Sequence, residues 1–254
     1  MSQKQILITG AASGIGQGIA FYLAAKGHHI IVSDMNLEHA QLTVNQIIKD
    51  GGSAQAEKLN VTLSEDVDKL IKNLDKPVDV LINNAGIQHV ESIDSFPMDK
   101  WDFLIQVMLV GVARLTQAVL PQMKSQDFGR VINIGSLHAL VASPYKSAYI
   151  AAKHGLLGFS KTISLEVATS NITINTLCPA YVKTPLVEKQ IVAQAKEHGM
   201  SEEAVVNNIM LKPMPKKAFI EIDELAASCE FLMSNLSKNI TAQAIALDGG
   251  WTAQ

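Results

Sequence analysis

The stretch TGAASGIG occupies residues 9–16, directly after the short apolar run QILIT at 5–9 and at the start of a helical pattern. Gly10, Gly14 and Gly16 stand where a missing Cβ matters: for a tight turn, for close approach of a ligand to the backbone, and for packing of helix on strand. The N-terminus of the following helix presents free N–H groups and a partial positive charge. This stretch predicts a phosphate-binding turn, although a glycine triplet alone is also compatible with a plain turn.

The rest of the chain alternates between short β-branched runs and longer helical patterns. Several of the runs are apolar at consecutive positions, which indicates strands buried on both faces and hence a parallel sheet. Strict alternation implies right-handed crossovers and a doubly wound sheet that binds ligands at the carboxyl ends of its strands. We expect Gly27 to close the first helix and Asp223 to N-cap the last. The predicted strands are 5–9, 29–33, 53–61 (the weakest), 78–83, 130–135, 172–178 and 244–248, and the predicted helices are 14–27, 37–50, 64–74, 98–125, 147–169 and 223–234.

Residues 185–222 interrupt this alternation. They contain two short amphipathic stretches, LVEKQIVAQAKEH and SEEAVVNNIMLK, followed by the turn-rich LKPMPKKAF. An insertion of this length is typical of a substrate lid, although a subunit interface is also compatible with it. We therefore expect a single α/β domain over 1–254, a doubly wound (Rossmann) fold of about seven parallel strands flanked by helices, with a helical substrate flap at 185–222.

Composition excludes several classes of protein. Lys and Arg total 21 against 24 Asp and Glu, so the formal charge is −3 and the basic excess of a nucleic-acid binder is missing. A hydrophobic fraction of 48% and a charged fraction of 18% suit a core-forming domain. Gly, Asn, Ser or a charge interrupts each apolar stretch, the N-terminus is a poor secretory signal, and no His, Cys, Asp and Glu cluster has metal-ligand spacing. We expect a soluble, cytoplasmic protein without a metal, in which Cys178 and Cys229 are buried free thiols.

An acidic residue and an asparagine-rich turn extend the predicted ligand site. Asp34 ends the second predicted strand, where a carboxylate accepts hydrogen bonds from both ribose hydroxyls of an adenosine and repels a 2′-phosphate. No Arg or Lys occurs at 33–37 to receive such a phosphate. Together with the glycines this favours NAD over NADP, whereas alone Asp34 would be a solvated turn residue. NNAG at 83–86 follows the fourth strand, and Gly86 there admits a cofactor closely.

Three further side chains predict the chemistry. Tyr149 and Lys153 are one helical turn apart, and Ser136 follows the fifth strand. A phenolate at neutral pH requires a lowering of the tyrosine pKa that costs about 4 kcal/mol, and a lysine ammonium about 4 Å away supplies roughly that much at an effective dielectric of about 20. We therefore expect Tyr149 to be a general base toward a hydroxyl or an acid toward a carbonyl, with Ser136 holding the reacting oxygen.

TGAASGIG, NNAG, Ser136, the Tyr149–Lys153 pair and PAYVKTP at 179–185 resemble the motifs of the short-chain dehydrogenase/reductase family, and the match runs from residue 5 to 250. More closely, NNAGIQHVESIDSFPMDKWD, VASPYKSAYIAAKHG, TPLVEKQI and DGGWTA resemble family members that act on 3-hydroxybutyrate. The resemblance implies an NAD-dependent homotetramer that interconverts (R)-3-hydroxybutyrate and acetoacetate. The cofactor-binding residues it implies are Gly10, Ser13, Gly14, Ile15, Gly16, Asp34, Asn60, Val61, Asn83, Ala85, Gly86, Tyr149, Lys153, Pro179, Val182 and Thr184.

The resemblance also implies a set of substrate-binding residues. A 3-hydroxy acid requires donors for its carboxylate, and that role falls on Gln88, His138, Lys146 and Gln190, beside Ser136 and Tyr149 at the reacting oxygen. Trp251 is expected to close the pocket, either its own or that of a neighbouring subunit. Without the resemblance, Lys146 would be a solvated lysine, Gln190 a helix-surface residue and Trp251 a subunit contact. His89 and His154 are expected to be structural.

The sequence departs from the family pattern at four positions. Met108 replaces an asparagine that anchors a water relay to the lysine, and a thioether cannot donate a hydrogen bond. Ala180 replaces a glycine near the nicotinamide, Tyr181 replaces a common tryptophan, and Asn60 replaces an aspartate at the adenine. Two alternatives therefore stay open: a dehydrogenase of another hydroxy acid or secondary alcohol, and a catalytically weak NAD-binding protein.

Overall fold

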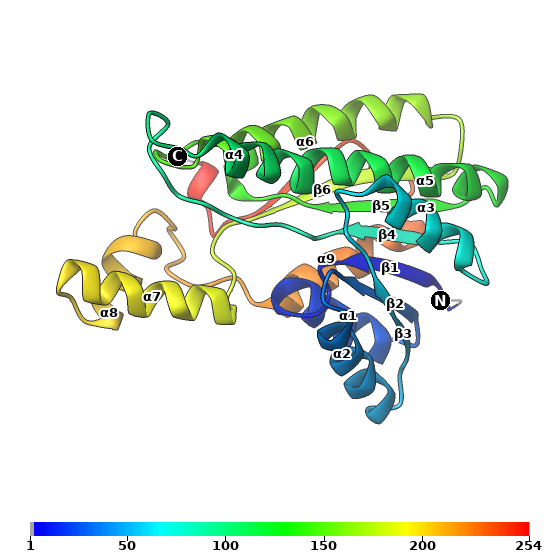
Figure 1. The fold of residues 1–254 in the computed structure, drawn as a ribbon, viewed down its shortest axis with the longest axis horizontal. Coiled ribbons are helices and arrows are strands. Elements are labelled where there is room, and N and C mark those ends of the chain that lie inside the picture. Colours follow the sequence, from blue (N-terminus) through cyan, green and yellow to red (C-terminus); the bar gives the residue numbers. More distant parts are fainter. Residues whose placement is uncertain (1–2, 254) are drawn as a thin grey trace.

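The computed structural model describes residues 3–253, and its seven strands form one parallel sheet (Figure 1). The strand order β3-β2-β1-β4-β5-β6-β7 reverses between β1 and β4, which confirms the doubly wound fold and places the ligand crevice there. The strands are β1 (Gln5–Thr9), β2 (His29–Asp34), β3 (Ser53–Lys58), β4 (Val80–Asn83), β5 (Gly129–Ile134), β6 (Ile172–Pro179) and β7 (Ala244–Leu247).

Helices cover both faces of the sheet, and this explains the continuous apolar strands. Ile6 and Ile8 pack toward α1, α2 and α9, while Leu7 between them packs toward α3, α4, α5 and α6. Figure 1 shows these two layers on opposite sides of the strands. The helices are α1 (Gly14–Ala25), α2 (Leu37–Lys49), α3 (Ser64–Asn73), α4 (Met98–Ile105), α5 (Gly111–Ser125), α6 (Ser147–Glu166), α7 (Pro185–His198), α8 (Glu202–Val205) and α9 (Ile222–Met233).

Two helix predictions require correction. The helix predicted over 98–125 contains a π-helical turn, Gln106–Val110, which separates α4 from α5. The last helix is capped by Glu221, not by Asp223, because it begins at Ile222 and the Glu224 side chain accepts from the Glu221 backbone N–H in a capping box.

The stretch Met98–Ser125 also corrects the expectation about apolar segments. Its 28 residues are long and apolar enough, by length and composition, to cross a bilayer. However, Leu115, Val119 and Met123 on this stretch are buried in the domain core. A core helix that packs on a sheet passes the same test, so this stretch gives weak support for a membrane span.

The insertion forms the predicted helices and projects from the domain. Figure 1 shows α7 and α8 extending away from the sheet, beyond the carboxyl ends of its strands. Thr184 caps α7 by accepting from the Val187 N–H at 3.3 Å, and Gly199 ends it in the left-handed region at φ +61°. A bridge between Val182 and Ile220 joins the two ends of the insertion. Its role as a lid stays a prediction.

Candidate active site

A cleft of about 610 Å³ opens at the carboxyl ends of β1, β4, β5 and β6. It lies beside the point where the strand order reverses, as expected for this fold. Most of the residues singled out in the sequence line it. These are Gly10, Ser13, Gly14, Ile15, Asp34, Ala85, Gly86, Gln88, Ser136, His138, Lys146, Tyr149, Lys153, Pro179, Val182, Thr184, Gln190 and Trp251.

The glycine turn has the backbone that a phosphate-binding loop requires. Gly10 and Gly14 have φ of +62° and +59°, which residues with a Cβ rarely adopt. A Cβ at Gly16 would lie 2.4 Å from the amide nitrogen of Asn84, so this glycine permits close packing. The Asn84 side chain donates to the Thr9 and Gly10 carbonyls at 2.9 and 3.0 Å. The turn and the end of β4 are thereby held together.

Four of the predicted cofactor residues do not line the cleft. Gly16 is packed beneath the turn, and Val61 is buried against Gly111. The Asn60 side chain accepts from the N–H and hydroxyl of Thr62, which commits it to a local turn. Asn83 donates to the Asn133 side chain at 2.8 Å inside the sheet. Their contact with a cofactor stays a prediction.

The three predicted catalytic residues lie together at one side of the cleft. Ser136 follows β5, and its hydroxyl accepts from the His138 N–H at 3.1 Å, which fixes the short helical turn Leu137–Ala139. Tyr149 and Lys153 project from α6 into the same space. The Lys153 Nζ donates to the Ile134 carbonyl at 2.7 Å and lies 5.7 Å from the centre of the Tyr149 ring. The carbonyl at the end of β5 therefore fixes the position of the buried Lys153 ammonium.

The pKa values of this pair correct one expectation. Burial raises the pKa of Tyr149, and a hydrogen bond with Ser136 opposes that rise. Burial also lowers the pKa of Lys153 to about 8. In the protein alone the Lys153 ammonium does not make the phenol acidic, because both groups lose solvation on burial and the lysine is directed to a carbonyl. The phenol requires a further positive charge to become a base at neutral pH.

His138, Lys146 and Ser143 form a polar cluster beside Tyr149. The Lys146 Nζ and the Ser143 Oγ both lie 3.3 Å from the His138 Nε2. Burial, together with the nearby Lys146 charge, lowers the pKa of His138 to about 4. An ammonium only donates, so the His138 Nε2 accepts and its Nδ1 carries the proton. The ring stands edge-on to Tyr149, with centroids 6.3 Å apart.

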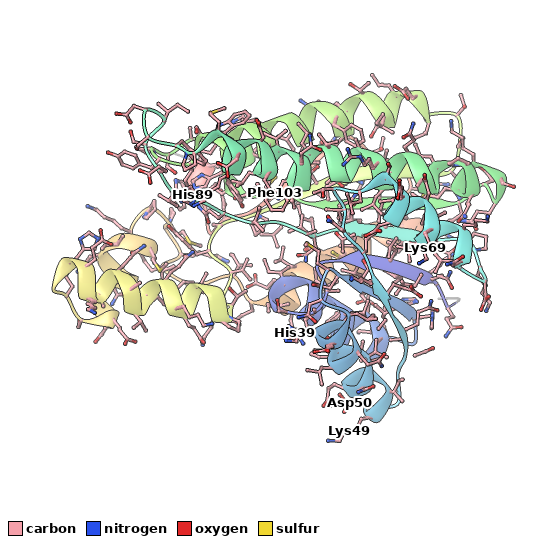
Figure 2. All side chains as sticks on the ribbon, in the orientation of Figure 1. His39, Lys49, Asp50, Lys69, His89 and Phe103 are labelled. Atoms are coloured by element: carbon pink, nitrogen blue, oxygen red, sulfur yellow. The ribbon has the colours of Figure 1, made fainter. Side chains whose placement is uncertain are left out.

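The remaining predicted donors approach from other elements. Gln88 lies on the segment after β4, and Gln190 lies on α7. Sequence reasoning missed Ser143, although it lies three residues before Lys146, and it missed Lys189, which lines the cleft beside Gln190. His89, labelled in Figure 2, packs edge-on against Phe96 at 5.1 Å and does not line the cleft. His154 contacts the Ile150 carbonyl of its own helix at 3.0 Å.

Asp34 and the four departures from the family pattern also have defined surroundings. The Asp34 carboxylate accepts from the Asn36 N–H at 3.0 Å and from the Ala12 N–H at 3.4 Å, and the residue lines the cleft. Met108 is buried in the π-helical turn, with its sulfur 3.7 Å from the position of a Cβ at Gly86. Ala180 and Tyr181 line the cleft, and the Tyr181 and Trp251 rings lie 6.3 Å apart.

Within residues 3–253, no group of three or more His, Cys, Asp and Glu side chains is placed to hold a metal ion. Cys178 and Cys229 are buried free thiols, as predicted. Burial raises the pKa of Cys178 to about 11 and that of Cys229 to about 12.

Comparison with known proteins identifies the class. The family model for short chain dehydrogenases matches residues 4–195. The chain therefore belongs to the short-chain dehydrogenase/reductase family of oxidoreductases, whose members bind nicotinamide cofactors.

Individual relatives are similar over the full length. The chain is 43% identical to a D-beta-hydroxybutyrate dehydrogenase of Rhizobium meliloti, with 99% of each chain covered. It is 41% identical to a D-beta-hydroxybutyrate dehydrogenase of Cupriavidus necator, with 100% of each covered. Among solved structures it resembles an actinorhodin polyketide ketoreductase variant crystallised with NADPH, at a TM-score of 0.93 and 29% identity over 99% of this chain and 98% of that one.

Proposed function

We propose that this enzyme interconverts (R)-3-hydroxybutyrate and acetoacetate, with NAD as its cofactor. The observation that carries the proposal is the convergence in one cleft of the Tyr149–Lys153 pair and of the Lys146 ammonium, which lies against His138. The hydroxyl and the carboxylate of a short hydroxy acid are only a few bonds apart. The protein groups that bind them must therefore lie in one pocket. The similarity to two D-beta-hydroxybutyrate dehydrogenases supports the same substrate.

The side chains of the cleft suit the proton transfer that such a reaction requires. When bound, NAD would accept the hydride from the substrate carbon, and its nicotinamide would bring a positive charge. Ser136 would donate a hydrogen bond to the substrate oxygen. Tyr149 would take the hydroxyl proton during oxidation and return it during reduction. Lys153 would stabilise the phenolate with its positive charge.

The residues present fit a dinucleotide, and Asp34 favours NAD. The positive φ of Gly10 and Gly14 and the free N-terminus of α1 provide a backbone cradle for the pyrophosphate. Asp34 lies on the cleft wall at the end of β2, where its charge would repel a 2′-phosphate. Comparing kcat/KM for NAD and NADP tests this assignment, and we expect NAD to be preferred at least about ten-fold, since one uncompensated charge contact is worth more than about 1.4 kcal/mol.

The polar cluster beside Tyr149 supports recognition of an anion. Lys146 offers a full charge at the cleft wall, and the His138 Nε2, 3.3 Å from the Lys146 Nζ, holds that ammonium beside Tyr149. A substrate carboxylate would accept a charge-assisted hydrogen bond from Lys146. Gln88, after β4, and Gln190, on α7, would complete the set.

The proposal includes a homotetramer that works in the cytoplasm. Large apolar side chains stand exposed on the outer surface, among them Phe103 at 42%, Leu165 at 77% and Leu236 at 86%. Contact between copies of the chain would cover such surfaces, as is common in symmetric oligomers.

The test is NADH formation at saturating NAD with each enantiomer of 3-hydroxybutyrate and with an uncharged secondary alcohol. We expect turnover of the R form. Replacing Lys146 by Met should raise KM for that substrate about 10- to 100-fold, because a charge-assisted hydrogen bond is lost. The matched control is Lys183→Met, an exposed lysine outside the cleft.

Other outcomes would support the alternatives. Turnover of the uncharged alcohol but not of the R form would show that the enzyme is a dehydrogenase of another alcohol. Binding of NAD without turnover of any alcohol would support a catalytically weak cofactor-binding protein.

A further inference from the structure

The last turn of the described chain is held by one carboxylate. Asp248 follows β7 and is only 8% exposed. Its carboxylate accepts from the Gly250 N–H at 2.9 Å and from the N–H and hydroxyl of Thr252 at 2.8 and 2.6 Å. Burial would raise the pKa of Asp248, but the hydrogen bonds from Thr252 and Gly250 outweigh it and lower that pKa. The residues between these partners are thus fixed in one tight turn.

This turn places Trp251 on the wall of the cleft. The Trp251 N–H donates to the Asp248 carbonyl at 3.2 Å, and its ring faces the Tyr181 ring at 6.3 Å with an angle of 33° between the planes. Both rings line the cleft. Tyr181 lies four residues before the insertion at 185–222, so the two aromatic rings join the C-terminal turn to the segment that leads into that insertion.

The same turn also contacts the returning end of the insertion. Lys216 donates its N–H to the Gly249 carbonyl at 3.1 Å. A Cβ at Gly249 would lie 3.1 Å from the end of the Met214 side chain, and one at Gly250 would lie 3.4 Å from Pro215. Both glycines have positive φ, +60° and +89°, so the turn requires them for conformation as well as for space.

We propose that Asp248 is a positioning residue that fixes Trp251 and both ends of the insertion at 185–222, and so sets the substrate half of the cleft. The role rests on the proposed function, because it concerns the pocket for the hydroxy acid. The adenosine part of the cofactor site lies at the turn after β1 and at the end of β2, whereas Pro179, Val182 and Thr184 of that site flank Tyr181. Substrate binding should therefore respond to Asp248 more strongly than cofactor binding, which keeps its contacts at β1 and β2.

The experiment compares Asp248→Asn, Thr252→Val and Thr252→Ser with the parent enzyme. We expect Asp248→Asn to raise KM for (R)-3-hydroxybutyrate at least about ten-fold while KM for NAD changes less than about two-fold, since only substrate contacts are displaced. Thr252→Val loses one of the three hydrogen bonds and should show a smaller rise. Thr252→Ser keeps the hydroxyl and should retain the parental KM.

A spectroscopic readout makes the positioning visible without turnover. Trp101 and Trp251 are the two tryptophans, so in a Trp101→Phe background the fluorescence reports Trp251 alone. Asp248→Asn should shift its emission to the red and increase its quenching by acrylamide. The matched control is Asp79→Asn, which removes a carboxylate that accepts from the Gln5 N–H at 2.8 Å. This contact lies at the amino-terminal end of β1, whereas the cleft lies at the carboxyl ends of the strands. This control should lower Tm but leave KM and emission unchanged.

The outcomes separate this inference from the proposed function. Asp248→Asn with a lowered Tm but parental KM and emission would overturn the positioning role. If that variant does not fold, equal KM and emission for Thr252→Val and Thr252→Ser would overturn it instead. If the parent enzyme does not oxidise 3-hydroxybutyrate, the proposed function fails, while the emission and quenching measurements still decide what Asp248 does.

Discussion

Tyr149 and Lys153 show how burial alone can work against the chemistry that a residue pair suggests. Burial raises the pKa of the phenol and lowers that of the amine, so it favours the neutral form of each group. Ser136 is the group on the protein that favours the phenolate. Activation of the base should therefore depend on charge that arrives with the cofactor, and the free protein should hold Tyr149 protonated at neutral pH.

Replacing Tyr149 by Phe tests the acid–base role directly. The change removes one hydroxyl from a buried ring, so we expect kcat to fall about 10²- to 10⁴-fold, the usual contribution of a general acid–base group. NAD affinity, measured by quenching of tryptophan fluorescence, should remain within a few-fold. A variant that oxidises the hydroxy acid at the parental rate would remove Tyr149 from the mechanism.

His138 predicts a pH dependence of stability. Its pKa in the folded protein is about 4, below the ordinary value of 6.5. As the pH falls from about 6.5 toward 4, the unfolded chain takes up a proton that the folded chain does not, so stability is lost over that window. One pKa unit corresponds to about 1.4 kcal/mol, and we expect about 1–2 kcal/mol here because the ring is partly solvent-exposed.

The measurement is urea unfolding at pH 7 and pH 4.5. The His138→Asn variant should lose less stability between these two pH values than the parent does. His39→Asn, an exposed histidine on α2, is the control and should behave as the parent. Equal acid sensitivity of the His138 variant and the parent would contradict the assignment.

Among the elements, the long α4–α5 stretch shows what sequence patterns predict and what they miss. Strands that are buried on both faces are apolar at consecutive positions, and this pattern predicted the parallel strands. All seven strands begin within two residues of their predicted starts. The π-helical turn Gln106–Val110 leaves the apolar periodicity almost intact and so gave no signal. The cap at Glu221 was missed because Asp and Glu both occur around that helix start.

The site residues divide in a similar way. The glycine turn, Asp34, Ser136 and the tyrosine–lysine pair follow from the spacing on strands and helices, and the structure brings them together. Ser143 and Lys189 were not predictable, because their contacts depend on how a loop and the insertion fold back. The pKa of Tyr149 was not predictable either, because burial is a property of the whole packed site.

Met108 in the π-helical turn offers a test at this scale. It is 1% exposed, and Lys153 already has the Ile134 carbonyl as a partner. We expect Met108→Asn to leave kcat within about two-fold and to lower stability by about 1–3 kcal/mol, because a buried amide replaces an apolar side chain. Thermal unfolding and NADH formation measure the two effects, with Met108→Leu as control. A clear rise in kcat would show that the missing asparagine limits turnover.

For the whole molecule, the exposed apolar side chains predict association. Phe231 is 47% exposed on α9, and Leu236 is 86% exposed just after that helix. Light scattering coupled to size exclusion should give a mass of about 110 kDa, four times the 27.4 kDa of one chain. A mass of one chain at micromolar concentration would refute the tetramer.

The two thiols provide an internal measure of how the molecule opens. Cys178 lies behind the catalytic residues on β6 and Cys229 lies on α9 in the layer that covers the other face of the sheet, and both are fully buried and protonated at neutral pH. An alkylating reagent can modify either one only after that part of the domain has separated. The alkylation rates of Cys178 and Cys229 therefore report separately on local opening of the catalytic centre and of the opposite helical layer.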